Sequence, residues 1–301
     1  MLSRLKRLVR RALPKKQKPF KLVMTLLVRD EQDILRANIE FHLAMGVDFI
    51  IATDNKSVDS TPDILKEYQA KGLLHYIYEG DDDYNQTAWV TRMARMAAND
   101  FDATWVINND ADEFWWPMSK DNLKDELKVL PPEICAVSAE RRDFVPVEGS
   151  ADAFASKMIY KEKQSYNAKG KPLPPKVAHR AIPHVEVVQG NHGVWGFPVY
   201  EEVTDAIEIQ HFPLRSYKQF ENKIVKGGQA YERNEKLGDT AGATWKGLYE
   251  EYKKGNLMAH YKEKEYSPER LQQGLDSGEL LLDERLPTLL KSLKIKDNVG
   301  L

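Results

Sequence analysis

Three carboxylates stand within four positions in the segment VINNDADEFWWP, residues 106–117: Asp110, Asp112 and Glu113. Carboxylates this close repel one another, and burying them is costly unless a cation is present. Two aspartates separated by one residue can present oxygens to one Mg²⁺ or Mn²⁺ ion, which accepts substrate phosphates at its open positions. The spacing alone is a weak signal, because Asp-x-Asp also occurs in solvent-exposed loops.

Apolar runs with the length of strands alternate with segments of helical spacing in the first part of the chain. The predicted strands are residues 21–28, 47–53, 73–79 and 104–108, and the predicted helices are residues 32–45, 60–72 and 86–99. This alternation predicts right-handed crossovers and a mostly parallel sheet, which binds ligands at the carboxyl ends of its strands. Polar or acidic segments follow all four strands and indicate one shared site: residues 29–31, 54–59, 80–86 and 108–113.

The remainder of the chain is less regular. Residues 145–200 are rich in Pro and Gly, and the chain from Ser216 onwards is mainly helical. We therefore predict an α/β fold in three parts: a basic amphipathic leader at residues 1–20, a main domain at residues 21–235 and a helical C-terminal extension at residues 236–301.

Charge is unevenly distributed. The formal net charge is −2, but residues 1–21 contain nine Lys or Arg and no acid, so the rest of the chain carries about −11. Leucines at helical spacing among these cations predict a short helix on an anionic membrane surface at residues 1–18. A disordered basic leader and a helix that docks on a partner are the alternatives. Nucleic acid is not expected as a partner, because the remaining chain is acidic and carries no recognition motif.

The chain has one cysteine, Cys135, and no apolar run that approaches the ~20 residues of a membrane span. One thiol cannot form an internal disulfide, which favours a reducing compartment. The N-terminus lacks the continuous apolar core of a signal peptide. We expect a cytoplasmic protein that the leader holds peripherally at the membrane face.

Three blocks of the sequence carry a resemblance to a known group of enzymes. They are VRDEQDILRANIEFHLAMGVDFIIATDNKSVDST (residues 28–61), WVINNDADEFWWP (residues 105–117) and HFPLRSYKQFENKIVKGG (residues 211–228). They resemble the nucleotide-sugar-dependent glycosyltransferases of the GT-A fold, near families 2 and 92, whose members carry an Asp-x-Asp-Glu-Phe motif. The resemblance covers roughly residues 21–235. It implies a Rossmann-like, mostly parallel sheet with flanking helices, and transfer of a sugar from a nucleoside diphosphate to a hydroxyl group.

The resemblance also implies a metal ion, Mn²⁺ or Mg²⁺, held by Asp110, Asp112 and His211. An ordinary core or surface histidine is the alternative for His211. The residues expected to bind the nucleotide sugar are Arg29, Asp30, Glu31, Asp54, Asn55, Gln86, Asp110, Arg215 and Lys223. Uracil is the expected base, although Asn55 stands where family 2 commonly has a second acid.

Some of these assignments have ordinary structural alternatives. Asp54 and Ser57 could form an Asx-type turn, and Arg215 and Lys223 could be solvated surface charges.

The sugar and the acceptor are expected near Glu113, Trp115, His179 and His192. Core packing is the alternative for the aromatic residues Phe114, Trp115 and Trp116. The segments 176–180 and 189–196 form a polar, glycine-flanked region that we expect to face the sugar or the acceptor.

An inverting transferase needs a general base beside the acceptor hydroxyl, and inversion dominates in these families. The candidates are Asp143 and Glu140, with Glu201 and Glu202 as further ones. The acceptor is expected to be a glycan or a lipid-linked molecule.

Two other function classes compete with the transferase. A nucleotidyltransferase would carry a Gly-rich, basic loop after its first strand, but residues 29–33 read RDEQD. A non-catalytic, membrane-docked protein that binds carbohydrate or nucleotide would use the carboxylates for a structural cation only.

Overall fold

The structure is a computed structural model that describes residues 18–81, 85–149, 154–167, 169–233 and 243–295. The predicted leader, residues 1–20, lies almost entirely outside the described residues, and so does the boundary predicted between residues 235 and 236. In the described part of the chain, no helix combines the length and the apolar character that a membrane span requires.

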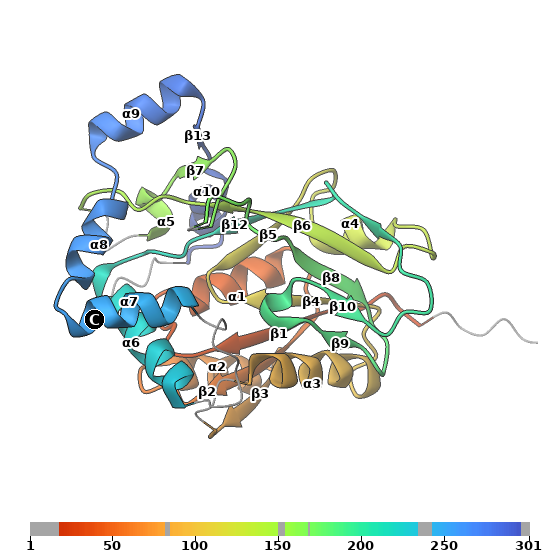
Figure 1. The fold of residues 1–301 in the computed structure, drawn as a ribbon. Coiled ribbons are helices and arrows are strands. Elements are labelled where there is room, and N and C mark those ends of the chain that lie inside the picture. The colour runs from red at the N-terminus through yellow and green to blue at the C-terminus, as the bar shows by residue number, and fades with distance from the viewer. Residues whose placement is uncertain (1–17, 82–84, 150–153, 168, 234–242, 296–301) are drawn as a thin grey trace, which may run out of the picture.

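The first part of the chain forms the parallel half of one large sheet (Figure 1). Its strands lie in the order β3-β2-β1-β4, all parallel: β1 (Leu22–Val28), β2 (Phe49–Asn55), β3 (Leu74–Glu79) and β4 (Trp105–Asp110). The helices that connect them are α1 (Leu35–Ala44), α2 (Thr61–Ala70) and α3 (Gln86–Asn99). The predicted alternation of strands and helices is confirmed.

The second half of the sheet is mixed and continues in the order β4-β8-β6-β12-β5. Its strands are β8 (Lys176–Arg180), β6 (Ala136–Asp143), β12 (Ile207–His211) and β5 (Glu113–Pro117), and the short β11 (Glu202–Val203) pairs with the start of β6. Strand β8 runs antiparallel to both of its neighbours, whereas β12 runs parallel to β6. Only two residues separate β4 from β5, so the sheet must curl to bring its last strand back to the end of β4.

The remaining elements cover this sheet or extend from it. Before β12 they are α4 (Leu123–Lys128), α5 (Phe154–Lys157), β7 (Tyr160–Glu162), β9 (Glu186–Val187), the short 3₁₀ helix η1 (Gln189–Asn191) and β10 (Val194–Trp195). After β12 they are α6 (Tyr217–Arg233), α7 (Ala243–Lys253), α8 (Leu257–Lys264), α9 (Pro268–Ser277), β13 (Leu280–Leu282) and α10 (Arg285–Ser292).

The C-terminal region is mainly helical, as predicted, but it also returns to the main body. Strand β13 pairs with β7. Leu286 and Leu290 of α10 belong to the same buried cluster as Leu22 and Phe41. The last described residues therefore contribute to the core of the sheet domain.

Both faces of the central strands are buried, which explains their continuous apolar runs. Leu22, Met24 and Leu26 of β1 lie in one cluster with the buried face of α1, whereas Val23 lies in a second cluster with Val90 of α3. The central sheet is thus covered on both sides, and polar side chains are left to the strand ends.

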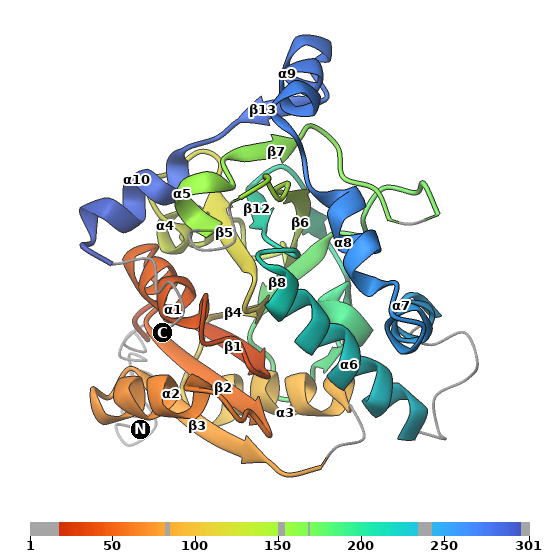
Figure 2. The ribbon, with the colours of Figure 1, turned by 90° about the vertical axis from the view of Figure 1, so that its left-hand side faces the viewer.

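Two strands run further than predicted, and one helix starts later. The ladder pairs Val28 with Asp54 and Leu27 with Asp110, so the polar ends of β2 and β4 are part of the sheet and not of loops. Helix α1 begins at Leu35, three residues after the predicted start. Figure 2 shows α6 beside the carboxyl ends of β1 and β2. Residues of α6 and of these strand ends line one pocket.

Candidate functional site

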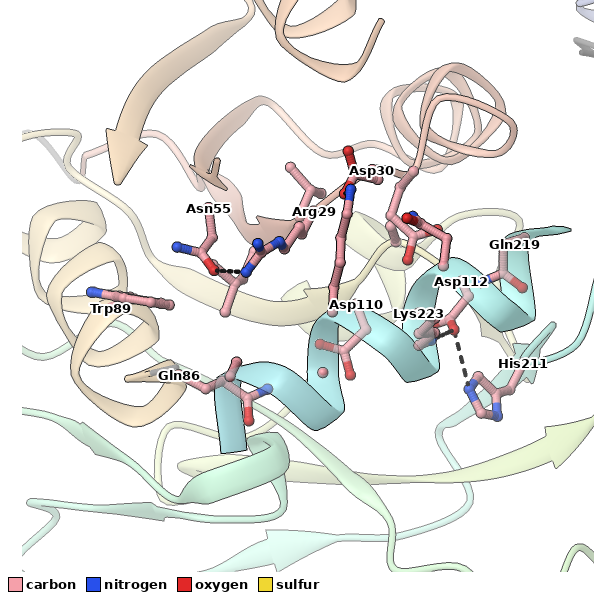
Figure 3. A pocket seen from close by; sticks show the side chains of 18 residues that line it. Arg29, Asp30, Asn55, Gln86, Trp89, Asp110, Asp112, His211, Gln219 and Lys223 are labelled. Carbon is pink, nitrogen blue, oxygen red and sulfur yellow. Dashed lines mark hydrogen bonds and ion pairs between the residues drawn. The ribbon is translucent and has the colours of Figure 1, made fainter. Parts of the chain in front are cut away.

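A pocket opens at the carboxyl ends of the parallel strands, as the sequence predicts (Figure 3). Arg29, Asn55 and Trp89 lie at one end of it, and Asp112 and His211 lie at the other. Helix α6 forms a wall along the pocket with residues Gln219, Asn222, Lys223, Lys226, Gly227 and Ala230.

The two aspartates end up in different surroundings on the turn between β4 and β5, residues 110–113, which we call the acidic turn. Asp110 accepts hydrogen bonds from the ammonium group of Lys176 and from Nδ2 of Asn191, the latter at 3.2 Å. Lys176 is only 2% exposed and also lies 3.3 Å from a carboxylate oxygen of Glu113. Burial alone would lower the pKa of Lys176, but the two carboxylates outweigh it and raise the pKa above its ordinary value.

Asp112 is buried and surrounded by cations. Its Oδ2 accepts a hydrogen bond from Nζ of Lys223 at 2.8 Å and lies 3.7 Å from Nε2 of His211. Burial would raise the pKa of Asp112, but the charges of Lys223 and His211 hold it well below the ordinary range. Asp112 is therefore a carboxylate.

His211 is oriented by a second carboxylate. Its Nδ1 donates to Oδ1 of Asp143 at 2.7 Å, so Nε2 faces Asp112. Burial would lower the pKa of His211, but Asp143 and Asp112 raise it to about 9. A carboxylate that accepts one ring N–H in this way also orients histidine ligands of metal ions, whose other ring nitrogen binds the metal.

The donor groups fit a divalent metal ion by their chemistry, since carboxylate oxygens and an imidazole nitrogen suit Mn²⁺. Among the residues that the structure describes, no three Asp, Glu, His or Cys side chains converge closely enough to hold an ion as they stand. The ammonium groups of Lys176 and Lys223 lie against the two aspartates instead. A metal ion and these lysines would compete for the same carboxylates.

The far end of the pocket carries the residues expected to meet the nucleoside. Nδ2 of Asn55 donates to the backbone carbonyl of Asp81 at 2.6 Å, and Oδ1 of Asn55 accepts from Nη1 of Arg29 at 3.4 Å. Gln86 lines the pocket and is held through Oε1 by Gln189 at 2.7 Å. Arg29, Asn55 and Gln86 are thus brought together in one place.

Asp54 lies beneath this end of the pocket and not on its wall. It is fully buried, and its carboxylate accepts from the backbone N–H of Ser57 at 2.9 Å and from the Tyr76 hydroxyl at 3.0 Å. This is the Asx-type turn named as the structural alternative. Asn55, one residue later, lines the pocket in its place.

The charged residues after β1 also differ in their contacts. Asp30 and Glu31 both line the pocket, and Asp30 forms an ion pair with Lys226 of α6. Burial raises the pKa of Glu31 to about 7, although Arg215 opposes this shift. Arg215 is itself buried and donates to Asp33 at 2.7 Å and to the backbone carbonyl of Phe212 at 3.0 Å. Arg215 therefore anchors the chain before α6 and does not line the pocket.

The residues expected to meet sugar or acceptor differ in burial: Trp115 and His179 are fully buried, whereas His192 is partly buried. Trp115 is fully buried with its indole N–H on Oδ1 of Asn109 at 2.8 Å, which is the core-packing alternative. His179 is fully buried, and burial lowers its pKa to about 4. Burial also lowers the pKa of His192 to about 4, and its Nδ1 lies 2.8 Å from the carbonyl of Pro175.

Glu113, the last residue of the acidic turn, is fully buried, and its carboxylate lies 3.3 Å from Lys176 and 3.6 Å from Arg141. Burial raises its pKa despite these cations. Within the described part of the chain, neither of its carboxylate oxygens has a hydrogen-bond partner.

The four candidate bases lie at different places along β6. Glu140 is 57% exposed, pairs with Arg142 and lies on the face of β6 opposite to Asp143. Glu201 and Glu202 lie at the start of β6, because the backbone carbonyl of Glu201 accepts from Cys135. Asp143, at the other end of β6, lies beside His211.

Lys226 and Trp89 line the pocket and were not predicted. Lys226 follows Lys223 by three positions on a helix, a spacing that places both side chains on one face and could have identified it. Trp89 lies within the predicted third helix, and the sequence gives no reason to distinguish it from a core residue.

The chain is similar to several proteins of known structure. Crystal structures of S. aureus TarS are similar in fold: residues 1–349 of TarS match at 14% identity over 84% of this chain and 82% of that one, with a TM-score of 0.42. Glucosyl-3-phosphoglycerate synthase from Mycobacterium tuberculosis, solved with Mn²⁺ and uridine diphosphate, matches at 14% identity over 54% of this chain and 57% of that one, with a TM-score of 0.32.

No curated protein sequence matches the chain. The sequence model of glycosyltransferase family 92, by contrast, matches residues 23–255, which is most of the chain. The described fold is a mixed α/β arrangement in which helices flank one large sheet. The chain belongs to glycosyltransferase family 92.

Proposed function

We propose that this protein transfers a sugar from a uridine diphosphate sugar to a hydroxyl group of a glycan or lipid-linked acceptor, with the help of Mn²⁺ or Mg²⁺ and with inversion. The observation that carries the proposal is that Asp110, Asp112 and His211 line the same pocket. Membership of family 92 supports the reaction class. The metal, the base, the acceptor and the inversion are the parts that experiment must test.

A divalent ion held by Asp112, Asp110 and His211 would neutralise the charge that develops on the departing diphosphate. Asp112 already presents its carboxylate to the pocket beside His211. The ammonium group of Lys223 must leave Asp112 for this to happen. Lys223 lines the same pocket, so the released ammonium remains within reach of a diphosphate and can bind it.

Asp143 is the general base that we propose among the four candidates. It lies at the sheet edge beside His211, and its side chain is 24% exposed. In the proposed step, the acceptor oxygen bonds to the anomeric carbon while the bond from that carbon to the diphosphate breaks. Asp143 takes the proton of the acceptor hydroxyl, and the nucleoside diphosphate leaves with the bonding electrons.

The nucleoside is proposed to occupy the end of the pocket formed by Arg29, Asn55 and Trp89. Arg29 offers N–H donors and Asn55 an amide oxygen, which can meet the carbonyl oxygens and the N3–H of uracil. Trp89 offers a flat apolar surface beside them.

The competing classes are less well supported. The segment after β1 is acidic and lacks glycine, which argues against a nucleotidyltransferase. The basic residues of the leader are the reason that we propose attachment to a membrane surface and a cytoplasmic, peripheral location. Co-sedimentation with anionic vesicles, measured with and without residues 1–17, tests the attachment.

The experiment that tests the function is a donor screen. The protein is incubated with labelled UDP-, GDP- and CDP-sugars, each with Mn²⁺ and with a chelator, and slow hydrolysis of the donor is recorded. We expect hydrolysis of a UDP-sugar that requires the metal. Equal inertness towards all donors, with the protein folded, would favour the non-catalytic binding protein.

A further inference from the structure

The acidic turn is held from behind by one side chain of α1. Asn38 is fully buried, and its Nδ2 donates to the backbone carbonyl of Ala111 at 2.9 Å and to that of Glu113 at 2.8 Å. These two carbonyls belong to the residues on either side of Asp112. A single amide group therefore fixes the peptide group just before this aspartate and the one that follows Glu113.

The same amide is bound on its oxygen side. Nδ2 of Asn109 donates to Oδ1 of Asn38 at 3.0 Å, and the indole of Trp115 donates to Oδ1 of Asn109 at 2.8 Å. One turn later on α1, Nδ1 of His42 lies 2.8 Å from the backbone carbonyl of Asn38. Burial lowers the pKa of His42 to about 4, so its imidazole is neutral and Nδ1 carries the proton.

The third carbonyl of the turn is held from the opposite side. The backbone N–H of Phe212, the residue after His211, donates to the carbonyl of Asp112 at 2.8 Å. Asn38 and Phe212 thus fix all three carbonyls from Ala111 to Glu113. Once the backbone is fixed in this way, the carboxylate of Asp112 can exchange Lys223 for another cation by side-chain rotation alone.

Space filling does not explain an amide at this position. An apolar side chain of the same shape, such as Leu, would fill the volume but leave two buried carbonyls without donors, which is costly. A carboxylate would place oxygen against oxygen. An amide is the group that offers two N–H donors to the turn and one acceptor to Asn109.

We propose that Asn38 is a positioning residue that fixes Asp112 in the orientation needed to bind the divalent ion and, through it, the diphosphate. The proposal rests on the proposed function for the identity of the ligands. It predicts that loss of the amide weakens the metal-dependent part of nucleotide binding and leaves the metal-independent part unchanged.

The test compares two variants with the same change of side chain. Asn38→Leu removes the amide at the turn. Asn108→Leu removes another fully buried amide, on β4, whose Oδ1 accepts from Thr25 at 2.9 Å and which has no hydrogen bond to the turn among the described residues. The affinity for UDP is measured by calorimetry with and without Mn²⁺. Hydrogen–deuterium exchange is followed in peptides that cover residues 110–116.

In Asn38→Leu we expect the gain in UDP affinity from Mn²⁺ to shrink about 10- to 100-fold, the range found when groups that support metal ligands are removed. The UDP affinity without Mn²⁺ should stay the same, and amide exchange at residues 111–114 should become faster. Asn108→Leu should change neither quantity. If Asn38→Leu does not fold, Asn38→Ala is measured in the same way.

A folded Asn38 variant with an unchanged Mn²⁺ gain and unchanged exchange overturns the proposal. If the unaltered protein binds neither UDP nor Mn²⁺, the proposed function fails instead. The role of Asn38 is then decided by exchange alone: faster exchange at residues 111–114 supports it as the residue that holds the turn, and unchanged exchange overturns it.

Discussion

The two lysines that hold the acidic turn lie on opposite sides of it and differ in their freedom to move. Lys176 rises from β8 in the sheet, is 2% exposed and contacts both Asp110 and Glu113. Lys223 projects from α6 at the pocket wall, is 33% exposed and contacts Asp112. A buried cation between two carboxylates is a fixed part of the fold, whereas a partly exposed one can leave its partner. We therefore propose Asp112 as the aspartate that exchanges its cation.

Asp112→Asn should have the largest effect on activity. It removes the carboxylate that we propose for the metal and leaves Lys223 and His211 without their shared anion. We expect donor turnover to fall by about 10³-fold or more, since loss of one transition-state charge contact costs about 10²–10³ and the metal is lost with it. Thermal unfolding measured alongside should show an intact fold. Full metal-dependent turnover in this variant would remove the central assignment.

Lys176→Met tests the fixed side of the comparison. It leaves the fully buried Glu113 and its neighbour Asp110 without their common cation. Breaking a buried ion pair on one side costs about 3–5 kcal/mol of unfolding free energy. Chemical denaturation of the metal-free protein measures this. A loss below about 1 kcal/mol, the level of a surface pair, would show that Lys176 is not the structural cation described here.

Lys223→Met tests the mobile side. Without the competing ammonium, Asp112 should bind Mn²⁺ more tightly in the absence of nucleotide, while the turnover of donor should fall about tenfold through loss of a charge on the diphosphate. The two effects are measured by Mn²⁺ titration and by steady-state kinetics. Glu140→Gln, on the face of β6 opposite to Asp143, is a surface control and should change neither Mn²⁺ affinity nor turnover. Weaker Mn²⁺ binding in Lys223→Met would contradict the proposal that Mn²⁺ replaces Lys223 at Asp112.

The smallest effect that we expect is a dependence of stability and Mn²⁺ affinity on pH, caused by the titration of His211. Asp143 and Asp112 outweigh burial and raise its pKa to about 9, above the ordinary 6.5. The protonated imidazole therefore stabilises the metal-free fold fully below pH 6.5, and this stability is lost as the pH rises through about 9. Mn²⁺ binds the neutral ring, so its affinity should rise over the same interval. Unfolding and Mn²⁺ titrations from pH 6.5 to 9 measure both trends, and His211→Gln should flatten them.

The parts of the site that follow one strand directly could be predicted from the sequence. The carboxyl ends of β1, β2 and β4 meet at one edge because parallel strands with short crossovers must do so. This rule is enough to predict that Arg29, Asn55 and Asp112 share one pocket, as they do.

Other parts depend on contacts between distant segments and could not be predicted with the same certainty. Lys176 reaches Asp110 because β8 inserts antiparallel beside β4, 66 positions away in the chain. Trp115 resembles a sugar-binding aromatic in sequence, but β5 is covered on both faces and buries it. Burial on two faces is a property of the assembled sheet, and no local pattern at Trp115 encodes it.

The central claim is that Asp110, Asp112 and His211 hold a divalent ion that binds the diphosphate of the donor. A crystal structure of the protein with Mn²⁺ and UDP tests it most directly. We predict the ion on Asp110, Asp112 and His211, with the diphosphate against it and Lys223 turned away from Asp112. Nucleotide bound elsewhere, with Lys223 still on Asp112 and no ion at the acidic turn, would contradict the account.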